Sequence, residues 1–438
     1  MLRSFRVANH RSIRDEQELV LLPAYDKPRE VVPVAAIFGA NAGGKTTVLD
    51  ALGFLQRIVR DSYRTWEPGS AIPRSPFLLD PARSLEPSTY AVDLVLCSVR
   101  YVYGISIDDR VVRDEWLYRF PHGRKQVVFE RDGHEIRLGF TVSDYRGRQR
   151  FLNEVTRGNA SALGAGAMID LTEVEPVYDW FRRRLRVHTQ PAGTTSAAAE
   201  ASRLLRTEGT DRDRLVEMLR AADLGITDLQ LERALHGKDA EHMTAGLDEL
   251  MSADESEPYV RWPNNARVRE LLLSRGWSCG YELRFVHGQS GVALSAEDQS
   301  AGTLAWLGML VAALDALTMG GVLCVDEIDA SLHPRLTAQL VSMFKDEEAN
   351  PKSAQLVFTT HDASLLGTSM GGEVLARDEV WFVEKDRDGA TTLFPLTDFK
   401  PRQHENTERR YLGGSYGAVP IVSDDDLRHA LAARAESD

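Results

Sequence analysis

A glycine-rich stretch, Gly39-Ala-Asn-Ala-Gly-Gly-Lys45-Thr46, constrains the fold of this 438-residue chain more than any other feature. It follows an apolar run, residues 34–38, and precedes a stretch with helical spacing that begins at Thr47. Glycines allow backbone amides to turn toward a phosphate chain, and the N-terminus of a helix adds the positive end of its dipole. A chance glycine-rich turn would lack this strand–loop–helix context, which therefore predicts a phosphate-binding loop.

Each residue type in the loop has an expected task. Lys45 would reach the β- and γ-phosphates, and the hydroxyl of Thr46 would ligate Mg²⁺. The sequence therefore predicts a bound nucleotide with Mg²⁺, held by Asn41, Gly43, Gly44, Lys45, Thr46 and Thr47.

Composition limits the class of protein. A chain of 438 residues is too long for one compact core, so we expect two or three structural units. No secretory signal is recognised, and no apolar run of about 18 residues is apparent, so no membrane span is predicted. Cys97, Cys279 and Cys324 are far apart in sequence, which is typical of a reduced cytoplasmic protein. The net charge of −13 argues against a whole surface that binds nucleic acid without specificity.

The hydrophobic pattern changes twice along the chain. Residues 1–149 contain the phosphate loop and, from 89 to 140, a period-two alternation typical of an antiparallel meander, with Asp132-Gly133 as a two-residue hairpin turn. Residues 150–280 show helical spacing and are interpreted as a helical insertion. Residues 281–438 begin with a strand pair, 281–287 and 292–295, that would lead back into the main domain.

Two strands of the C-terminal part end in polar residues. The apolar run 320–325 ends in Asp326-Glu327, where Asp326 would hold Mg²⁺ through water and Glu327 would polarise the attacking water. Such a strand is common by itself, but together with the phosphate loop it indicates hydrolysis. A second buried run, 355–360, precedes His361. A lone histidine at a strand end is more often structural than catalytic, but this one falls where a γ-phosphate sensor would lie.

Ser300-Ala301-Gly302-Thr303 precedes a strongly helical run, 304–317. A serine and glycine at a helix N-terminus can bind an anion, or Ser300 can simply cap the helix. Taken alone, the segment favours the cap.

In this order, the segments resemble an ABC-type ATPase head, and within that class the heads of the SMC, RecF and overcoming-lysogenization-defect ATPases. The chain is similar to the AAA15 family of prokaryotic ATPases, which includes subunits of anti-phage and abortive-infection systems. The resemblance covers roughly residues 1–140 and 280–420, and it is carried by the segments Asp326–Pro334, Gln355–Asp362 and Glu405–Pro420. It implies an α/β fold, a P-loop ATPase head with a mixed central sheet and an antiparallel β subdomain, here carrying the helical insertion.

The resemblance also implies a mechanism. Two heads would hold ATP between the phosphate loop of one copy and Ser300 and Gly302 of the other, with Ser331 in the loop after the acids close to the same interface. Glu327 would act as the base, and His361 would lie beside the γ-phosphate. Arg11 either approaches the phosphates or is a surface arginine, and both interpretations remain open.

Two departures accompany the resemblance. The segment Ser-Ala-Gly-Thr replaces the usual Leu-Ser-Gly-Gly-Gln. The glutamine that usually follows the phosphate-loop helix has two candidates, Gln126 and Gln149, neither in a convincing context.

Other classes and partners can be compared. The Asn-Lys-x-Asp motif of GTPases is absent, and a ring-forming AAA+ ATPase would keep its Asp-Glu strand closer to the phosphate loop. The basic run Trp180–Arg186 could contact nucleic acid or an acidic partner, although a solvated helix face is favoured. No nuclease signature is visible, so any toxic chemistry is expected on a separate effector protein. Two functions follow: a cytoplasmic, homodimeric or larger ATPase that senses or regulates such an effector in antiviral defence, or a RecF-like ATPase that acts directly on DNA.

Overall fold

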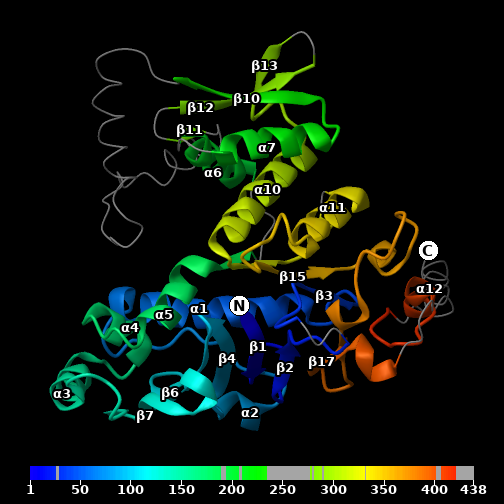
Figure 1. Cartoon of the computed structure of the whole chain (residues 1–438). Coiled ribbons are helices and arrows are strands. Elements are labelled where there is room, and N and C mark those ends of the chain that lie inside the picture. Colours follow the sequence, from blue (N-terminus) through cyan, green and yellow to red (C-terminus); the bar gives the residue numbers. More distant parts are fainter. Residues whose placement is uncertain are drawn as a thin grey trace, which may run out of the picture.

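The computed structural model describes residues 1–25, 29–188, 194–206, 210–233, 277–278, 281–288, 291–330, 332–400 and 406–420 (Figure 1). Residues 234–276 of the expected helical insertion, together with Ser331, Cys279 and the last residues of the chain, lie outside these ranges.

A mixed six-stranded sheet forms the centre of the molecule. Its strand order is β17-β16-β3-β15-β14-β9. Five of its strands are parallel, and only the edge strand β17 runs antiparallel, to β16. The bounds are β3 Val34–Gly39, β9 Leu185–His188, β14 Val322–Val325, β15 Gln355–Thr360, β16 Val380–Lys385 and β17 Thr391–Pro395. The carboxyl ends of the parallel strands therefore meet at one edge of the sheet, where α/β proteins place ligands.

Helices cover both faces of this sheet (Figure 1). Helix α1 (Lys45–Thr65) packs on one face, in the same buried cluster as Ala35 and Ile37. Helices α10 (Ala301–Met319) and α11 (Pro334–Lys345) pack on the other, with Val34, Ala36 and Phe38. Because successive residues of β3 point to opposite faces, a strand that is apolar throughout is buried on both sides. The short helix α12 (Thr407–Leu412) adds Tyr411, which stacks on Phe382 with ring centroids 5.5 Å apart.

A seven-stranded antiparallel sheet lies on the other side of α1. Its order is β2-β1-β4-β5-β6-β7-β8, and its apolar residues share one cluster with α1. The bounds are β1 Leu2–Ala8, β2 Gln17–Val20, β4 Ser88–Leu96, β5 Val99–Ile107, β6 Val112–Phe120, β7 Gln126–Asp132 and β8 Glu135–Leu138; helix α2 (Pro81–Leu85) precedes β4. The predicted fold class, a mixed central sheet with an antiparallel β subdomain, is confirmed. The predicted turn is one residue out of place, because Asp132 pairs with Glu135 and leaves Gly133-His134 as the loop.

Residues 145–188 pack on the head. Helices α3 (Tyr145–Val155), α4 (Ala162–Met168) and α5 (Glu175–Asp179) lead through a π-helical turn, Trp180–Arg184, into β9 of the central sheet. The buried carboxylate of Glu115, on β6, accepts the amides of Ala162 and Leu163 and so holds α4 against the antiparallel sheet. The sequence predicted a helical insertion at 150–280, with helical spacing from Val177 to Val187, and β9 differs from this. A four-residue strand is too short to show a period of two. We propose that the insertion begins after His188.

The remaining elements form a small lobe above α10 (Figure 1). Helices α6 (Thr194–Arg206) and α7 (Thr210–Ala221) pack on α10. Strands β10 (Ile226–Arg233), β11 (Trp277–Ser278), β12 (Tyr281–His287) and β13 (Val292–Ser295) form a separate sheet. The predicted strand pair β12–β13 is present, but it belongs to this small sheet and not to the central one. Strand β10 is a second strand within the segment that was predicted as a helical insertion.

Helix α10 corrects the expectation that the chain contains no apolar run long enough to span a membrane. Its 19 residues are long and apolar enough to cross a membrane, by length and composition alone, although no run of that length was recognised in the sequence. In the fold, 61% of its most apolar window is buried, as in the core helix of a globular head.

Candidate nucleotide site

The carboxyl edge of the central sheet gathers the residues expected to handle a nucleotide. Strand β3 ends at Gly39 and leads into the phosphate loop, β14 leads into Asp326-Glu327, and β15 leads into His361. Their parallel pairing sets the three loops side by side, with β15 between β3 and β14.

The phosphate loop closes on its own lysine. Helix α1 begins at Lys45, after Gly44 with a φ of 106°. Lys45 Nζ donates to the carbonyl oxygens of Gly39 at 2.8 Å and Ala40 at 3.2 Å. Burial lowers the pKa of Lys45, against the opposing charges of Glu327, Asp326 and Asp329. The ammonium therefore lies within the field of three carboxylates while it spans the loop.

A threonine orders the two acids. The Thr359 hydroxyl donates to Asp326 Oδ1 at 2.5 Å and accepts the Glu327 amide at 2.7 Å. Asp326 is buried, whereas Glu327 is exposed and has a φ of 49°. Left-handed backbone at a glutamate is costly and often marks a functional turn. The turn leaves Asp326 anchored and presents Glu327 to solvent.

His361 is held at the edge of the site. Its Nε2 lies 3.0 Å from Asp329 Oδ2, and the imidazole is 60% exposed while the carboxylate is 7% exposed. Asp329 Oδ1 is buried and has no hydrogen-bond partner within the described part of the chain. Ser331, expected in the same loop, lies outside that part.

The turn between β1 and β2 reaches α1 through Asp50. Arg11 Nε and His10 Nε2 lie 2.8 Å and 2.9 Å from Asp50 Oδ2, and His10 Nδ1 lies 2.9 Å from the Tyr90 hydroxyl. Burial lowers the pKa of His10, although its hydrogen bond to Asp50 opposes the shift. Burial would raise the pKa of Asp50, but the hydrogen bond and charge of His10 and the charge of Arg11 lower it. Arg11 is thus a half-exposed arginine paired with α1, beside the loop. No pattern in the sequence marked His10 or Asp50 as a site residue.

Ser300 caps helix α10. Its hydroxyl accepts the Thr303 amide at 3.1 Å, and Ser300 itself is exposed. Among residues 1–25, 29–188 and 291–330, no hydrogen bond joins Ser300–Thr303 to the phosphate loop. The cap interpretation therefore describes this segment within one copy of the chain, and Gly302 adds a half-buried position in the first turn.

Neither candidate glutamine lies at this edge. Gln126 accepts from Arg119 Nε on the antiparallel sheet, and Gln149 accepts the Leu138 amide from its position on α3. On the side away from β15, β14 adjoins β9, whose last residue, His188, accepts the Asp326 amide at 2.9 Å through its carbonyl oxygen. Gln190 follows two positions later in the sequence, outside the described residues. Periodicity missed β9, so Gln190 was not among the candidates drawn from the sequence.

In the basic run after Asp179, the arginine side chains reach solvent and the two aromatic side chains are buried. Trp180 and Phe181 are 1% and 0% exposed, so neither can stack on a base. Arg183 pairs with Asp179 at 3.2 Å and Arg186 with Asp315 at 3.1 Å.

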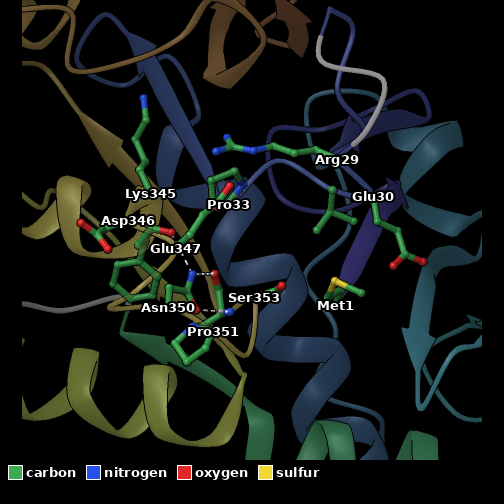
Figure 2. A pocket seen from close by; sticks show the side chains of 13 residues that line it. Met1, Arg29, Glu30, Pro33, Lys345, Asp346, Glu347, Asn350, Pro351 and Ser353 are labelled. Atoms are coloured by element: carbon green, nitrogen blue, oxygen red, sulfur yellow. Dashed lines mark hydrogen bonds between the residues drawn. The ribbon is translucent and has the colours of Figure 1, made fainter.

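A separate pocket of about 320 Å³ lies at the opposite, amino-terminal edge of the sheet (Figure 2). Pro33 and Ser353, which precede β3 and β15, line it with Glu347. Asn350 closes one wall through bonds to Phe344 and Ala354. This pocket is distinct from the nucleotide edge and offers a place for control substitutions.

Comparison with known families identifies the head. Residues 34–367 match the family described as AAA domain, putative AbiEii toxin, Type IV TA system. The chain belongs to this family. The AAA domain match begins at β3 and extends past His361, so it contains the phosphate loop, the acidic pair and the histidine, and leaves out Arg11 and β17. No curated protein matches.

Solved structures of SMC heads are similar to this AAA domain chain at low identity. The SMC head bound to the C-winged helix domain of ScpA has 12% identity and a TM-score of 0.41, covering 91% of this chain and 99% of its own. The SMC head domain from Thermotoga maritima has 10% identity and a TM-score of 0.39, covering 90% and 98%. An SMC head with an extended coiled coil, bound to a ScpA domain derived from Pyrococcus furiosus, has 12% identity and a TM-score of 0.35, covering 91% and 97%.

Proposed function

We propose that this protein binds ATP with Mg²⁺ at the carboxyl edge of the central sheet and hydrolyses it. The observation that carries the proposal is the buried Lys45, which closes the phosphate loop and lies in the field of Asp326, Glu327 and Asp329. A cationic loop residue facing a cluster of carboxylates is the arrangement that a magnesium–triphosphate complex requires, because the metal bridges acid and phosphate.

The donor set at this edge fits Mg²⁺. Thr46 offers a hydroxyl and Asp326 a carboxylate with one oxygen already fixed by Thr359, and magnesium prefers such oxygen ligands with water and phosphate completing its shell. When bound, the metal neutralises charge on the phosphates. Glu327 is exposed beside this position and would accept a proton from water, while His361 would donate to the terminal phosphate.

The test uses Glu327→Gln, which keeps the size of the side chain but cannot accept the proton. ATP hydrolysis should fall about 100-fold or more, while ATP affinity stays within about twofold. Glu347→Gln, at the opposite edge of the sheet (Figure 2), should hydrolyse ATP like the wild type. Equal rates for wild type and Glu327→Gln would overturn the assigned base.

We also propose that ATP joins two copies of the chain. Ser300 is exposed at the N-terminus of a 19-residue helix and makes no bond to its own phosphate loop in the described residues. A second copy could place this helix N-terminus on the γ-phosphate, where the helix dipole favours negative charge. Glu327→Gln should then accumulate as a dimer or larger assembly with ATP, measured by light scattering.

Gln190 is our candidate for the glutamine that senses the phosphate and metal. It follows β9, the strand beside Asp326, whereas Gln126 and Gln149 make bonds within the antiparallel subdomain. Gln190→Ala should lower hydrolysis at least about tenfold, and Gln149→Ala should leave it unchanged. The reverse result would reject Gln190.

We further propose, within the AAA15 group, that the ATPase regulates a separate effector in abortive-infection defence. The family description, which names a putative toxin of a type IV toxin–antitoxin system, supports a toxin–antitoxin setting for the chain. Growth should continue when the chain, or Glu327→Gln, is expressed alone, and a partner protein should co-purify with Glu327→Gln from the source cell. Growth arrest by the chain alone would place the toxic activity on this protein.

Direct action on DNA, as in a RecF-like ATPase, is the less favoured alternative. Trp180 and Phe181 are buried, and Arg183 and Arg186 are paired with acids. ATPase stimulation by gapped DNA that disappears when Arg182–Arg184 are changed to Glu would reverse this preference.

A further inference from the structure

Thr391, the first residue of the edge strand β17, reaches the phosphate loop from the far end of the sequence. Its side chain is buried, with the residue 2% exposed. The Thr391 hydroxyl lies 2.8 Å from Ser12 Oγ and 3.0 Å from the carbonyl oxygen of Gly43, so its one hydrogen can be donated to either oxygen. A single hydroxyl group thus contacts both the turn after β1 and the loop that closes over Lys45.

Ser12 extends the connection to helix α1. Its Oγ lies 3.0 Å from the hydroxyl of Thr47, in the first turn of that helix. The backbone also fixes the geometry, because the Thr391 amide donates to the Ser12 carbonyl at 2.7 Å. This backbone bond holds Thr391 next to Ser12 independently of the contacts that their side chains make with the loop.

The close approach of Gly44 to Thr391 independently indicates that Thr391 packs directly against the loop. Gly44 has a φ of 106°, and a Cβ built on it would lie 2.2 Å from Thr391 Oγ1 and 2.7 Å from Thr391 Cγ2. No side chain larger than hydrogen fits between the backbone and this threonine, and the positive φ independently favours glycine. Gly44 is thus required by close approach as well as by the loop motif.

The contact to Gly43 sets the orientation of a backbone amide. The peptide group is planar and trans, so the carbonyl of Gly43 and the N–H of Gly44 point in opposite directions. Since the carbonyl points at Thr391, the Gly44 amide points away from β17. Backbone amides turned this way are the groups with which a phosphate-binding loop holds its anion.

We infer that Thr391 is a positioning residue for the nucleotide: it orients the Gly43–Gly44 peptide so that the Gly44 amide is available to a phosphate. The inference rests on the proposed function, since it assumes that the loop binds ATP. It also extends the site beyond residues 34–367, because Ser12 and Thr391 both lie outside the family match. The N-terminal turn and the C-terminal edge strand would thus jointly brace the loop.

The test compares Thr391→Val, Thr391→Ser and Thr392→Val in the full chain. Valine keeps the volume but removes the donor, which leaves the Gly43 carbonyl without its side-chain partner, so the Kd for ATP with Mg²⁺ should rise about tenfold. Serine keeps the hydroxyl and should stay within about twofold of wild type. Thr392 is on the exposed face of the same strand and is the matched control. The rate at saturating ATP should change by less than about twofold, because Glu327 and His361 are untouched.

The outcomes separate this inference from the proposed function. Thr391→Val with wild-type affinity, or equal losses for Thr391→Val and Thr392→Val, would overturn the positioning role. If Thr391→Val does not fold, Thr391→Ala replaces it; it also removes the donor to Gly43, so it should weaken ATP binding in the same direction, and unchanged affinity would count against the inference. A wild-type chain that binds no ATP would instead overturn the proposed function.

Discussion

The hydroxyl of Thr359 joins β15 to the acid that follows β14, donating to Asp326 Oδ1 across 2.5 Å. The same oxygen accepts the Glu327 amide at 2.7 Å, so one threonine fixes both the carboxylate that we propose as a metal ligand and the backbone of the proposed base. Neighbours that orient a metal ligand in this way commonly affect activity nearly as much as the ligand itself.

We predict that Thr359→Val lowers ATP hydrolysis about 10- to 100-fold and raises the Mg²⁺ concentration needed for half-maximal rate. Valine has nearly the same volume, but it leaves Asp326 Oδ1 without its partner and frees the carboxylate to rotate. Thr337→Val is the control, because the buried Thr337 hydroxyl has no hydrogen-bond partner in the described residues. Unchanged magnesium dependence in Thr359→Val would contradict the role given to this threonine.

The sequence predicted the local motifs and missed the contacts between distant segments. Lys45, Asp326 and His361 were found because each follows an apolar strand, and parallel pairing then brings those strand ends together. Thr359 was invisible as a functional residue because it is simply part of a buried strand. Strand β9 was missed because its four residues show no period and depend on pairing with β14 for their conformation.

The contacts of Arg11 also join distant segments and could not be predicted from the sequence. Asp50 looked like an ordinary helix position, and only the fold of the turn after β1 brings His10 and Arg11 to it. Which carboxylate pairs with His10 and Arg11 therefore depends on the tertiary fold, and no spacing rule along the chain could predict it.

Replacing Asp50 and Arg11 separately should distinguish packing from nucleotide contact. Asp50→Ala removes both the charge that pairs with Arg11 and the acceptor that holds buried His10, so the free energy of unfolding should fall by about 1–3 kcal/mol. Arg11→Ala breaks a half-exposed pair and should cost at most about 1 kcal/mol. Urea unfolding measures the loss of unfolding free energy in each variant. Equal losses would contradict the conclusion that Asp50 contributes more to stability than its pair with Arg11 does. ATP affinity of Arg11→Ala then decides between the two interpretations of Arg11: weaker binding assigns a phosphate contact, and unchanged binding leaves only the pairing.

Burial of His10 predicts a pH dependence of stability. The pKa of His10 is lowered below its ordinary value of 6.5, so at pH values just below 6.5 the unfolded chain binds a proton that the folded chain does not. Stability due to His10 is thus complete above that pH and is lost as pH falls toward the folded pKa. The groups that act on it are Asp50, which favours the proton, Arg11 and Arg57, which oppose it, and the hydroxyl of Tyr90.

We predict that, between about pH 7.5 and pH 5.5, wild type loses more unfolding free energy than His10→Asn, with a difference in slope of at most about 1.4 kcal/mol per pH unit. The other histidines are common to both proteins and cancel in the comparison. The lowered pKa of Asp50 acts only below its ordinary value of 3.8, outside this range. Parallel pH profiles for the two proteins would show that His10 is not buried in its neutral form.

Complementation between two inactive variants tests whether one site needs two chains. Lys45→Ala removes the loop lysine, and Ser300→Asp should repel the γ-phosphate while keeping the cap, because aspartate is as good an N-cap as serine. Each variant alone should be inactive. In an equal mixture, about half of the dimers contain one copy of each variant. Each mixed dimer has two sites, and one of these combines an intact loop with an intact Ser300. About a quarter of wild-type ATPase activity should therefore return. Ser300→Asn, with the cap but no charge, controls for bulk. If the mixture is as inactive as its parts while both variants still assemble, Ser300 does not act on the partner's nucleotide, and its role is limited to capping helix α10.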